Sequence, residues 1–197
     1  MVRNLEKRDA LQVAGLHIQG ISKGFISSLG QLFVASLYEA IAEDKNSFGF
    51  VEVEGDKVLG FVVFSRNLSG LYKSILFKKG FKFGLIIAKQ IFSFRVLKKI
   101  FDNIFYPSKM KTLNLPDAEL LSIAVSQQGQ GKGIAKKLIK FGFRECAKRN
   151  IGQIKVLVAA NNEPANNLYQ KCGFELKTQI DNHNILSNIY VKDLKKA

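Results

Sequence analysis

A strand, a glycine-rich turn and a helix follow one another without a break between residues 118 and 150, and this order constrains the fold more than any other feature. The segment "AELLSIAV" is typical of a buried central strand, and it leads into "SQQGQGKG". The helix formers that follow predict a helix over "GKGIAKKLIKFGFRECAKRN", with Ile134, Leu138 and Phe141 on its inner side. A strand that turns directly into a helix is typical of mixed α/β domains.

The glycine-rich turn has the features of an anion site. The first N–H groups of a helix have no partner within the helix, and the helix dipole adds positive charge there. Without Cβ atoms at Gly131 and Gly133, the backbone can close around a phosphate or pyrophosphate, and Lys132, Lys136 and Lys137 add charge nearby. The dinucleotide fingerprint and the P-loop both fit poorly, because the spacing differs and Gly133 stands where the P-loop has Ser or Thr.

The rest of the chain predicts a mixed arrangement of strands and helices. Strands are expected over 1–5, 47–55, 57–66, 151–160, 174–180 and 184–194, and helices over 9–21, 29–44 and 163–173. The second and third strands form an expected antiparallel hairpin with its turn at Gly55. In the second strand Phe48 and Phe50 alternate on the opposite parity to Val51 and Val53, so its start faces differently or the strand contains a bulge.

Residues 67–115 have a different composition. They hold ten Lys or Arg, one acidic residue and seven of the sixteen phenylalanines. Apolar residues at helical spacing predict two or three basic amphipathic helices that end near Pro107. Such an insertion can pack on the domain, shape the substrate site, lie on an anionic membrane surface, or form a contact in a homodimer.

Composition narrows the class of protein. The chain of 197 residues fits a single domain over 1–197 with an insertion at about 67–115. Its net charge of +14 favours an anionic partner, but no zinc spacing or RNA-binding signature supports nucleic-acid binding. Cys146 and Cys172 lack the spacing of metal ligands or of a disulfide framework, which predicts no metal and two reduced, buried thiols in a cytoplasmic protein. No signal peptide is recognised, and charges interrupt the longest apolar run.

Two motifs together resemble the GCN5-related N-acetyltransferases (GNAT). The acetyl-CoA motif of that family, [QR]-x-x-G-x-[GA], is matched by Gln130–Ala135, and its second signature by "NEPANNLYQKCGFE" at 162–175. The resemblance covers residues 119–191 well, whereas 67–115 match nothing that the family shares. It implies a mixed, mostly antiparallel twisted sheet flanked by helices, with a helical insertion between the third and fourth strands.

The resemblance also implies how acetyl-CoA is bound. The CoA pyrophosphate would be held by the backbone N–H groups of Gln130, Gly131, Lys132, Gly133, Ile134 and Ala135. The pantetheine arm would pair like an added strand with the main chain of Ile123, Ala124 and Val125, and Asn162 would contact the CoA arm.

The family's chemistry needs an acid and a base. An amine attacks the thioester, a tetrahedral intermediate collapses, and Tyr169 matches the usual general acid that protonates the leaving thiolate. Its alternative role is that of a core aromatic residue. Glu119 resembles the glutamate that removes the amine proton through water in one branch of the family, and it is alternatively an ordinary strand-end carboxylate. A second branch places its base on the next strand, but this chain has Leu157 there, which argues against that arrangement. His17 and His183 are also able to deprotonate an amine, but a structural or surface role is expected for both.

These residues predict a cytoplasmic N-acetyltransferase that uses acetyl-CoA and no metal. Its acceptor is a primary amine, and the basic insertion favours an anionic small molecule such as an amino sugar. An alternative of another class is a non-catalytic CoA-binding or membrane-surface adaptor on the same scaffold.

Overall fold

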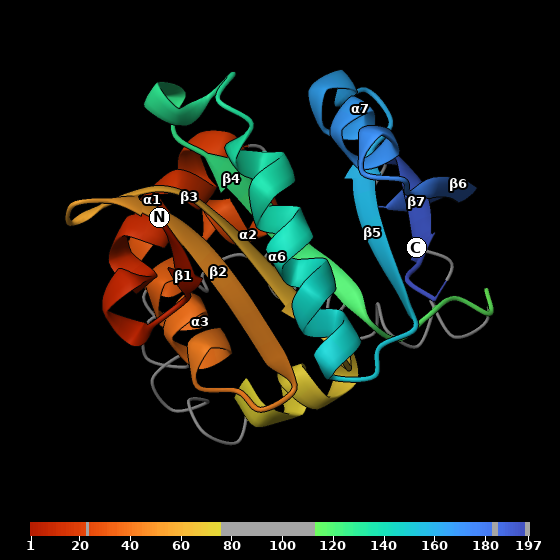
Figure 1. Cartoon of the computed structure of the whole chain (residues 1–197), viewed down its shortest axis with the longest axis horizontal. Helices are drawn as coiled ribbons and strands as arrows, with labels where there is room; N and C mark the ends of the chain where they lie inside the picture. Colours follow the sequence, from red (N-terminus) through yellow and green to blue (C-terminus); the bar gives the residue numbers. More distant parts are fainter. Residues whose placement is uncertain (23, 76–112, 183–184, 196–197) are drawn as a thin grey trace, which may run out of the picture.

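A seven-stranded sheet forms the centre of the computed structural model, which describes residues 1–22, 24–75, 113–182 and 185–195 (Figure 1). The strand order across the sheet is β1-β2-β3-β4-β5-β7-β6. The strands are β1 (Val2–Asn4), β2 (Ser47–Glu54), β3 (Lys57–Ser65), β4 (Glu119–Val125), β5 (Gln153–Ala159), β6 (Glu175–Asn182) and β7 (Ile185–Asp193).

Helices cover both faces of the sheet. One face packs against α1 (Ala10–Gly20) and α3 (Gln31–Ala42), which are joined through the short α2 (Phe25–Ser28). The other face packs against α6 (Ile134–Lys148) and α7 (Glu163–Lys171). Each face has its own apolar core, so the sheet is buried on both sides. The four-residue α2 was not expected, because a single turn is too short to leave a helical period in the sequence.

The sheet is antiparallel except where β4 meets β5. A parallel pair needs a crossover connection, and α6 supplies it. The recorded register of this pair is a single position, Glu119 opposite Lys155. Figure 1 shows the two strands close together at their beginnings and apart at their ends, with α6 in front of them. The sheet is therefore two antiparallel sets, β1–β4 and β5-β7-β6, joined at one end of the β4–β5 seam.

The parity of β2 follows from the burial of both of its faces. Phe48 and Phe50 belong to the core under α6, whereas Val51 and Val53 pack against the core under α1 and α3, because both faces of the strand are covered. The pairing with β3 also shifts register between Glu52 and Val53, where the extra residue is Leu59 of β3. This irregularity comes after Val51, so it does not cause the change of parity. The pattern is explained by the first expectation, that the start of the strand faces differently.

The region after β3 begins with a helix. Residues 68–75 are helical and pack Leu68 and Leu71 into the core under α1 and α3. The helices predicted for 76–112 lie outside the described residues. Cys146 is buried as expected, whereas Cys172 is only half-buried, and both are free thiols. Within the described ranges, no helix combines the length and apolar character that a membrane crossing needs.

Candidate functional site

The three glycines between β4 and α6 serve two different purposes. Gly131 and Gly133 have φ angles of +73° and +74°, and a Cβ on either would meet no atom within 4 Å. Gly129 instead lies in a crowded place, because a Cβ there would be 2.9 Å from side-chain atoms of both Val125 and Ile134. Two glycines therefore shape the turn and leave open space beside it, and the third lets the turn lie close to the core.

This turn presents unpaired backbone donors. The N–H of Gln130 donates to Ser126 O at 3.1 Å, and that of Lys132 donates to Gly129 O at a long 3.4 Å. Among the described residues, no acceptor contacts the remaining predicted N–H groups, which are those of Gly131, Gly133, Ile134 and Ala135. Gly133 is the N-cap of α6, and no side chain caps this helix. The turn can therefore accept an anion at the positive end of a 15-residue helix.

The three predicted lysines are not equivalent. The Lys137 ammonium contacts both carboxylate oxygens of Glu52, at 2.8 and 2.9 Å. Lys132 and Lys136 are exposed beside the turn. The positive charge available to a bound anion therefore comes mainly from these two side chains and the helix terminus.

Beyond the turn, β4 has an edge along which no strand of the described residues pairs. Its residues 119–125 pair with β3 on one side. On the other side β5 is in register only at Glu119, so Ile123, Ala124 and Val125 have no strand partner there within the described part of the chain. An extended ligand can add to this edge as a strand would.

Tyr169 lies on α7 and faces the core beneath α6. Its side chain is only 5% exposed, and its ring meets those of Phe174 and Tyr190 at centroid distances of 5.6 and 6.4 Å. Burial raises the pKa of Tyr169, so the phenol keeps its proton throughout the neutral range. The residue is a core aromatic and also holds a proton that it can donate, so the geometry is compatible with both predicted roles.

A buried amide holds α7 in place. Asn166 Nδ2 donates to the carbonyl oxygens of Asn162 and Ala159, at 2.7 and 3.0 Å, and Asn166 Oδ1 accepts from Asn188 and Tyr190. The amide thereby ties α7 to the end of β5 and to β7. Tyr190 belongs to this network through its hydroxyl and flanks Tyr169 with its ring.

Sequence reasoning missed this network. Its signal was weak, because Asn166 is only one polar residue on the inner side of a predicted helix. Asn162 was predicted to contact CoA, and here its Oδ1 accepts from the N–H of Ala165 at 3.3 Å and caps α7. The cap places Asn162 at the start of α7, directly after β5.

Glu119 begins β4 on the opposite face of the sheet. Its neighbour Leu120 packs under α6, so the Glu119 side chain points towards the face of α1 and α3. The carboxyl group is buried, and Lys155 Nζ lies 3.4 Å from its Oε2. Lys155 Nζ also donates to the carbonyl oxygens of Pro116 and Asp117. Burial raises the pKa of Glu119 although the Lys155 charge opposes that shift, which makes the carboxylate a stronger base than an exposed one.

The remaining positions considered for the base are Leu157, His17 and His183. Leu157 is half-buried on β5. His17 is buried in α1, and its Nδ1 lies 2.7 Å from the Tyr38 hydroxyl. His183 lies outside the described residues. In the part of the chain that the structure describes, no three His, Cys, Asp or Glu side chains are grouped as metal ligands.

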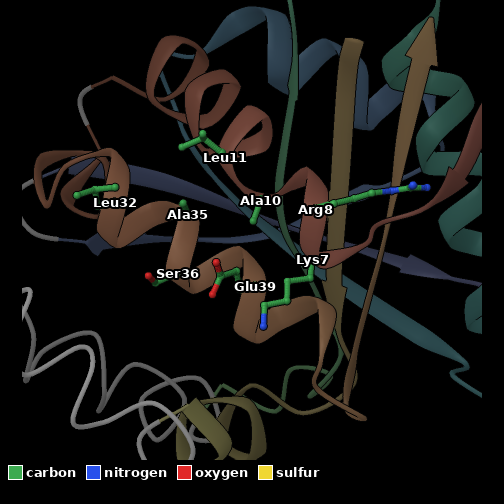
Figure 2. Close-up of a pocket in the computed structure, with 8 residues that line it drawn as sticks. All are labelled: Lys7, Arg8, Ala10, Leu11, Leu32, Ala35, Ser36 and Glu39. Atoms are coloured by element: carbon green, nitrogen blue, oxygen red, sulfur yellow. The ribbon is translucent and has the colours of Figure 1, made fainter. Parts of the chain in front are cut away.

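A separate hollow of about 410 Å³ lies on the outer side of α1 and α3 (Figure 2). It is lined by Lys7, Arg8, Ala10, Leu11, Leu32, Ala35, Ser36 and Glu39. Leu11 and Leu32 are largely exposed there. None of the predicted site residues lines this hollow, so it is distinct from the β4–α6 turn.

Comparison with known proteins is consistent with this geometry. A model of the protein family described as "Acetyltransferase (GNAT) family" matches residues 22–174. A streptothricin acetyltransferase from Escherichia coli is 42% identical over 59 residues, which are 30% of this chain and 34% of that protein. The aligned segment thus spans about a third of that relative.

Solved structures share the fold at low identity. An N-acetyltransferase from Staphylococcus aureus Mu50 is 18% identical, with a TM-score of 0.65 and 98% of each chain covered. The ribosomal-protein-S18-alanine N-acetyltransferase from Escherichia coli is 16% identical, with a TM-score of 0.63, and the match covers 98% of this chain and 93% of that one. At such identities the likeness concerns the fold alone.

Proposed function

This chain belongs to the acetyltransferase (GNAT) family, and from that premise we propose that it moves an acetyl group from acetyl-CoA to a primary amine. Enzymes of this family use acetyl-CoA, as predicted from the motifs, and the predicted family and mixed α/β fold are confirmed. The observation that carries the proposal is the open turn at Gly131 and Gly133, where free N–H groups meet the start of α6.

The residues present fit the cosubstrate. The unpaired N–H groups of Gly131, Gly133, Ile134 and Ala135 would hold the pyrophosphate, and the unoccupied edge of Ile123–Val125 would pair with the pantetheine arm. Bound acetyl-CoA supplies an acetyl group activated as a thioester. The chain's own side chains then have to manage two protons, one lost by the amine and one gained by the departing sulfur.

We assign these protons to residues on opposite faces of the sheet. Tyr169, on the α6–α7 face, donates its phenolic proton to the sulfur. Glu119, on the α1–α3 face, accepts the amine proton through water, and its buried position keeps its basicity high. The gap between β4 and β5 lies between Tyr169 and Glu119. This arrangement agrees with a reaction at the end of the pantetheine arm.

The acceptor that we propose is the amine of an anionic small molecule, such as an amino sugar. The support is the charge of the insertion, with ten basic residues against one acidic residue over 67–115. We also propose a single-domain organisation, a cytoplasmic location, a homodimer contact and a peripheral membrane contact.

A paired substitution tests the cofactor site. Gly133→Glu places a carboxylate beside the free N–H groups, and we expect it to abolish acetyl-CoA binding in titration calorimetry. The matched control is Gly55→Glu, because Gly55 also has a positive φ, +56°, and open space around its Cβ, but lies in the β2–β3 turn. Equal affinity in folded Gly133→Glu would disprove the assignment.

Activity itself needs a separate measurement. Thiol release from acetyl-CoA is followed across amino sugars, nucleotide-linked amino sugars, polyamines and peptide amines. Turnover with one class identifies the acceptor and excludes the adaptor alternative. Tight acetyl-CoA binding without turnover in any class would instead favour a non-catalytic CoA-binding protein.

A further inference from the structure

Three buried polar side chains meet on the α1–α3 face of β4. His17 comes from α1, Tyr38 from α3 and Ser122 from β4, and their exposures are 6%, 1% and 9%. His17 Nδ1 lies 2.7 Å from the Tyr38 hydroxyl and 3.4 Å from the Ser122 hydroxyl. The second ring nitrogen, Nε2, is buried and has no hydrogen-bond partner among the residues that the structure describes. An unpaired buried polar atom costs about 1–3 kcal/mol, so this atom calls for an explanation.

The protonation state of the ring follows from its surroundings. Burial lowers the pKa of His17 to about 4, so the imidazole is neutral at physiological pH and has one N–H. A buried donor without a partner is rarer in proteins than a buried acceptor without one. We therefore place the proton on Nδ1, where it is donated to Tyr38, and the lone pair on Nε2. Ser122 Oγ lies 3.4 Å from the same His17 Nδ1, which links the cluster to β4.

Along β4, the cluster of His17, Tyr38 and Ser122 lies level with the expected position of the acetyl group of bound acetyl-CoA. In the proposed complex the pantetheine arm runs from the glycine turn along β4, past Val125, Ala124 and Ile123 in that order. Ser122 is the next residue in this direction. The β3–β4 pairing is irregular here, since Ser122 is opposite Val63 but Leu120 is opposite Phe64. Glu119 lies about 10 Å further along the strand, at about 3.3 Å per residue. The cluster is thus nearer than Glu119 to the end of the arm.

We propose that His17, Tyr38 and Ser122 form the subsite for the acceptor nitrogen, in which His17 Nε2 accepts a hydrogen bond from an N–H of the amine. A neutral ring does not repel an amine that arrives as an ammonium ion. In the tautomer placed above, Nδ1 donates to Tyr38 and Nε2 is left as an acceptor. The amine would approach the ring from the edge of β4 that β5 leaves unpaired, and its proton would then pass to Glu119 through water. The proposal rests on the proposed function, because it takes the arm of acetyl-CoA as its reference.

Two CoA thioethers test the subsite without a known acceptor. In one, CoA–S–CH₂–CO–NH₂, a carboxamide N–H₂ stands near the position of the acceptor nitrogen. In the other, CoA–S–CH₂–CO–CH₃, a methyl group replaces it. The ratio of their dissociation constants, measured by titration calorimetry, isolates the N–H contacts from the binding of CoA. We expect the carboxamide to bind about 3–10-fold more tightly to the wild type, as one net hydrogen bond would give.

Three variants should remove that preference. His17→Leu removes the acceptor nitrogen. Tyr38→Phe removes the hydroxyl that contacts Nδ1, so the imidazole can change its tautomer, and Ser122→Ala removes the contact with β4. In each variant the ratio of the two dissociation constants should fall to about 1, while the affinity for CoA stays within about twofold. The control is Ser36→Ala, which removes a buried hydroxyl from the same helix as Tyr38 but outside the cluster. A ratio that survives in His17→Leu, or an equal loss of CoA affinity in these variants, would overturn the proposal.

A measurement on the intact side chains covers the case in which these variants fail to fold. The chain has two histidines, and His183→Gln leaves His17 as the sole imidazole for ¹⁵N NMR. We expect Nε2 to show the shift of an unprotonated nitrogen and to move with the carboxamide but not with the ketone. A protonated Nε2, or identical shifts with both ligands, would refute the subsite. Failure of both ligands and of CoA to bind would refute the proposed function instead.

Discussion

Lys155→Met should be far more damaging than the loss of an ordinary lysine, because it leaves Glu119 buried without a cation. Both side chains of the pair are less than one-tenth exposed, and their charged atoms lie 3.4 Å apart. Removing one partner of a buried ion pair costs about 3–5 kcal/mol, so we expect a loss of that size in the free energy of unfolding at neutral pH. The pair of the exposed Lys148 with the partly exposed Glu145 provides a control, and Lys148→Met should cost less than about 1 kcal/mol.

The loss should depend on pH in a stated direction. Burial already raises the pKa of Glu119, and without Lys155 the pKa rises further. A carboxyl group whose pKa is higher in the folded than in the unfolded state favours folding at pH values below its unfolded pKa, and this contribution is lost as pH rises through the folded pKa. Lys155→Met should therefore lose less stability at about pH 5 than at about pH 8.

Urea unfolding of the single and double variants measures both effects. Adding Glu119→Gln to Lys155→Met removes the buried charge and should recover most of the lost free energy and abolish the extra pH dependence. If Lys155→Met costs no more than Lys148→Met, or if the double variant recovers nothing, Glu119 is not a buried charge held by Lys155. Its assignment as a base of raised pKa would then lose its physical ground.

Three further substitutions test the roles of particular side chains. Tyr169→Phe should lower kcat by about 10²–10⁴-fold with unchanged CoA affinity, and near-normal turnover would make the tyrosine structural. Glu119→Gln should shift the pH profile of kcat/KM to higher pH, since the reaction then relies on free amine, whereas an unchanged profile would assign the base elsewhere. Gly142→Ala should destabilise by about 1–3 kcal/mol in urea unfolding, because its Cβ would overlap the buried Phe64 ring. Phe64→Leu should relieve this cost, and a more stable Gly142→Ala would show that the helix propensity of alanine prevails.

The sequence predicted best those features whose causes are local. The strand–glycine–helix order and the second signature are each contained in a short segment, so the turn at Gly133 and the helix that carries Tyr169 were found from the sequence. The hairpin of β2 and β3 was found for the same reason, because its turn and its alternation are adjacent in the chain.

Features that depend on distant partners could not be predicted. His17 and Ser122 are 105 positions apart, and Asn166 meets partners 22 and 24 positions away on β7. A helical period shows that such a residue faces inward, but not which polar group it meets there. His17 was accordingly expected to be structural, and the unpaired Nε2 became visible only from the packing of α1 on β4.

The divergence of β4 and β5 also has a mechanical consequence. Because β4 and β5 pair only at Glu119 and Lys155, the two sets of strands can rotate apart about that end of the sheet. A pantetheine arm that is hydrogen-bonded to the inner edge of β4 and contacts the start of α7 would hold the two sets of strands together. Hydrogen exchange of the backbone amides along the facing edges of β4 and β5 would then slow together. The bound cosubstrate would thus stabilise the sheet itself.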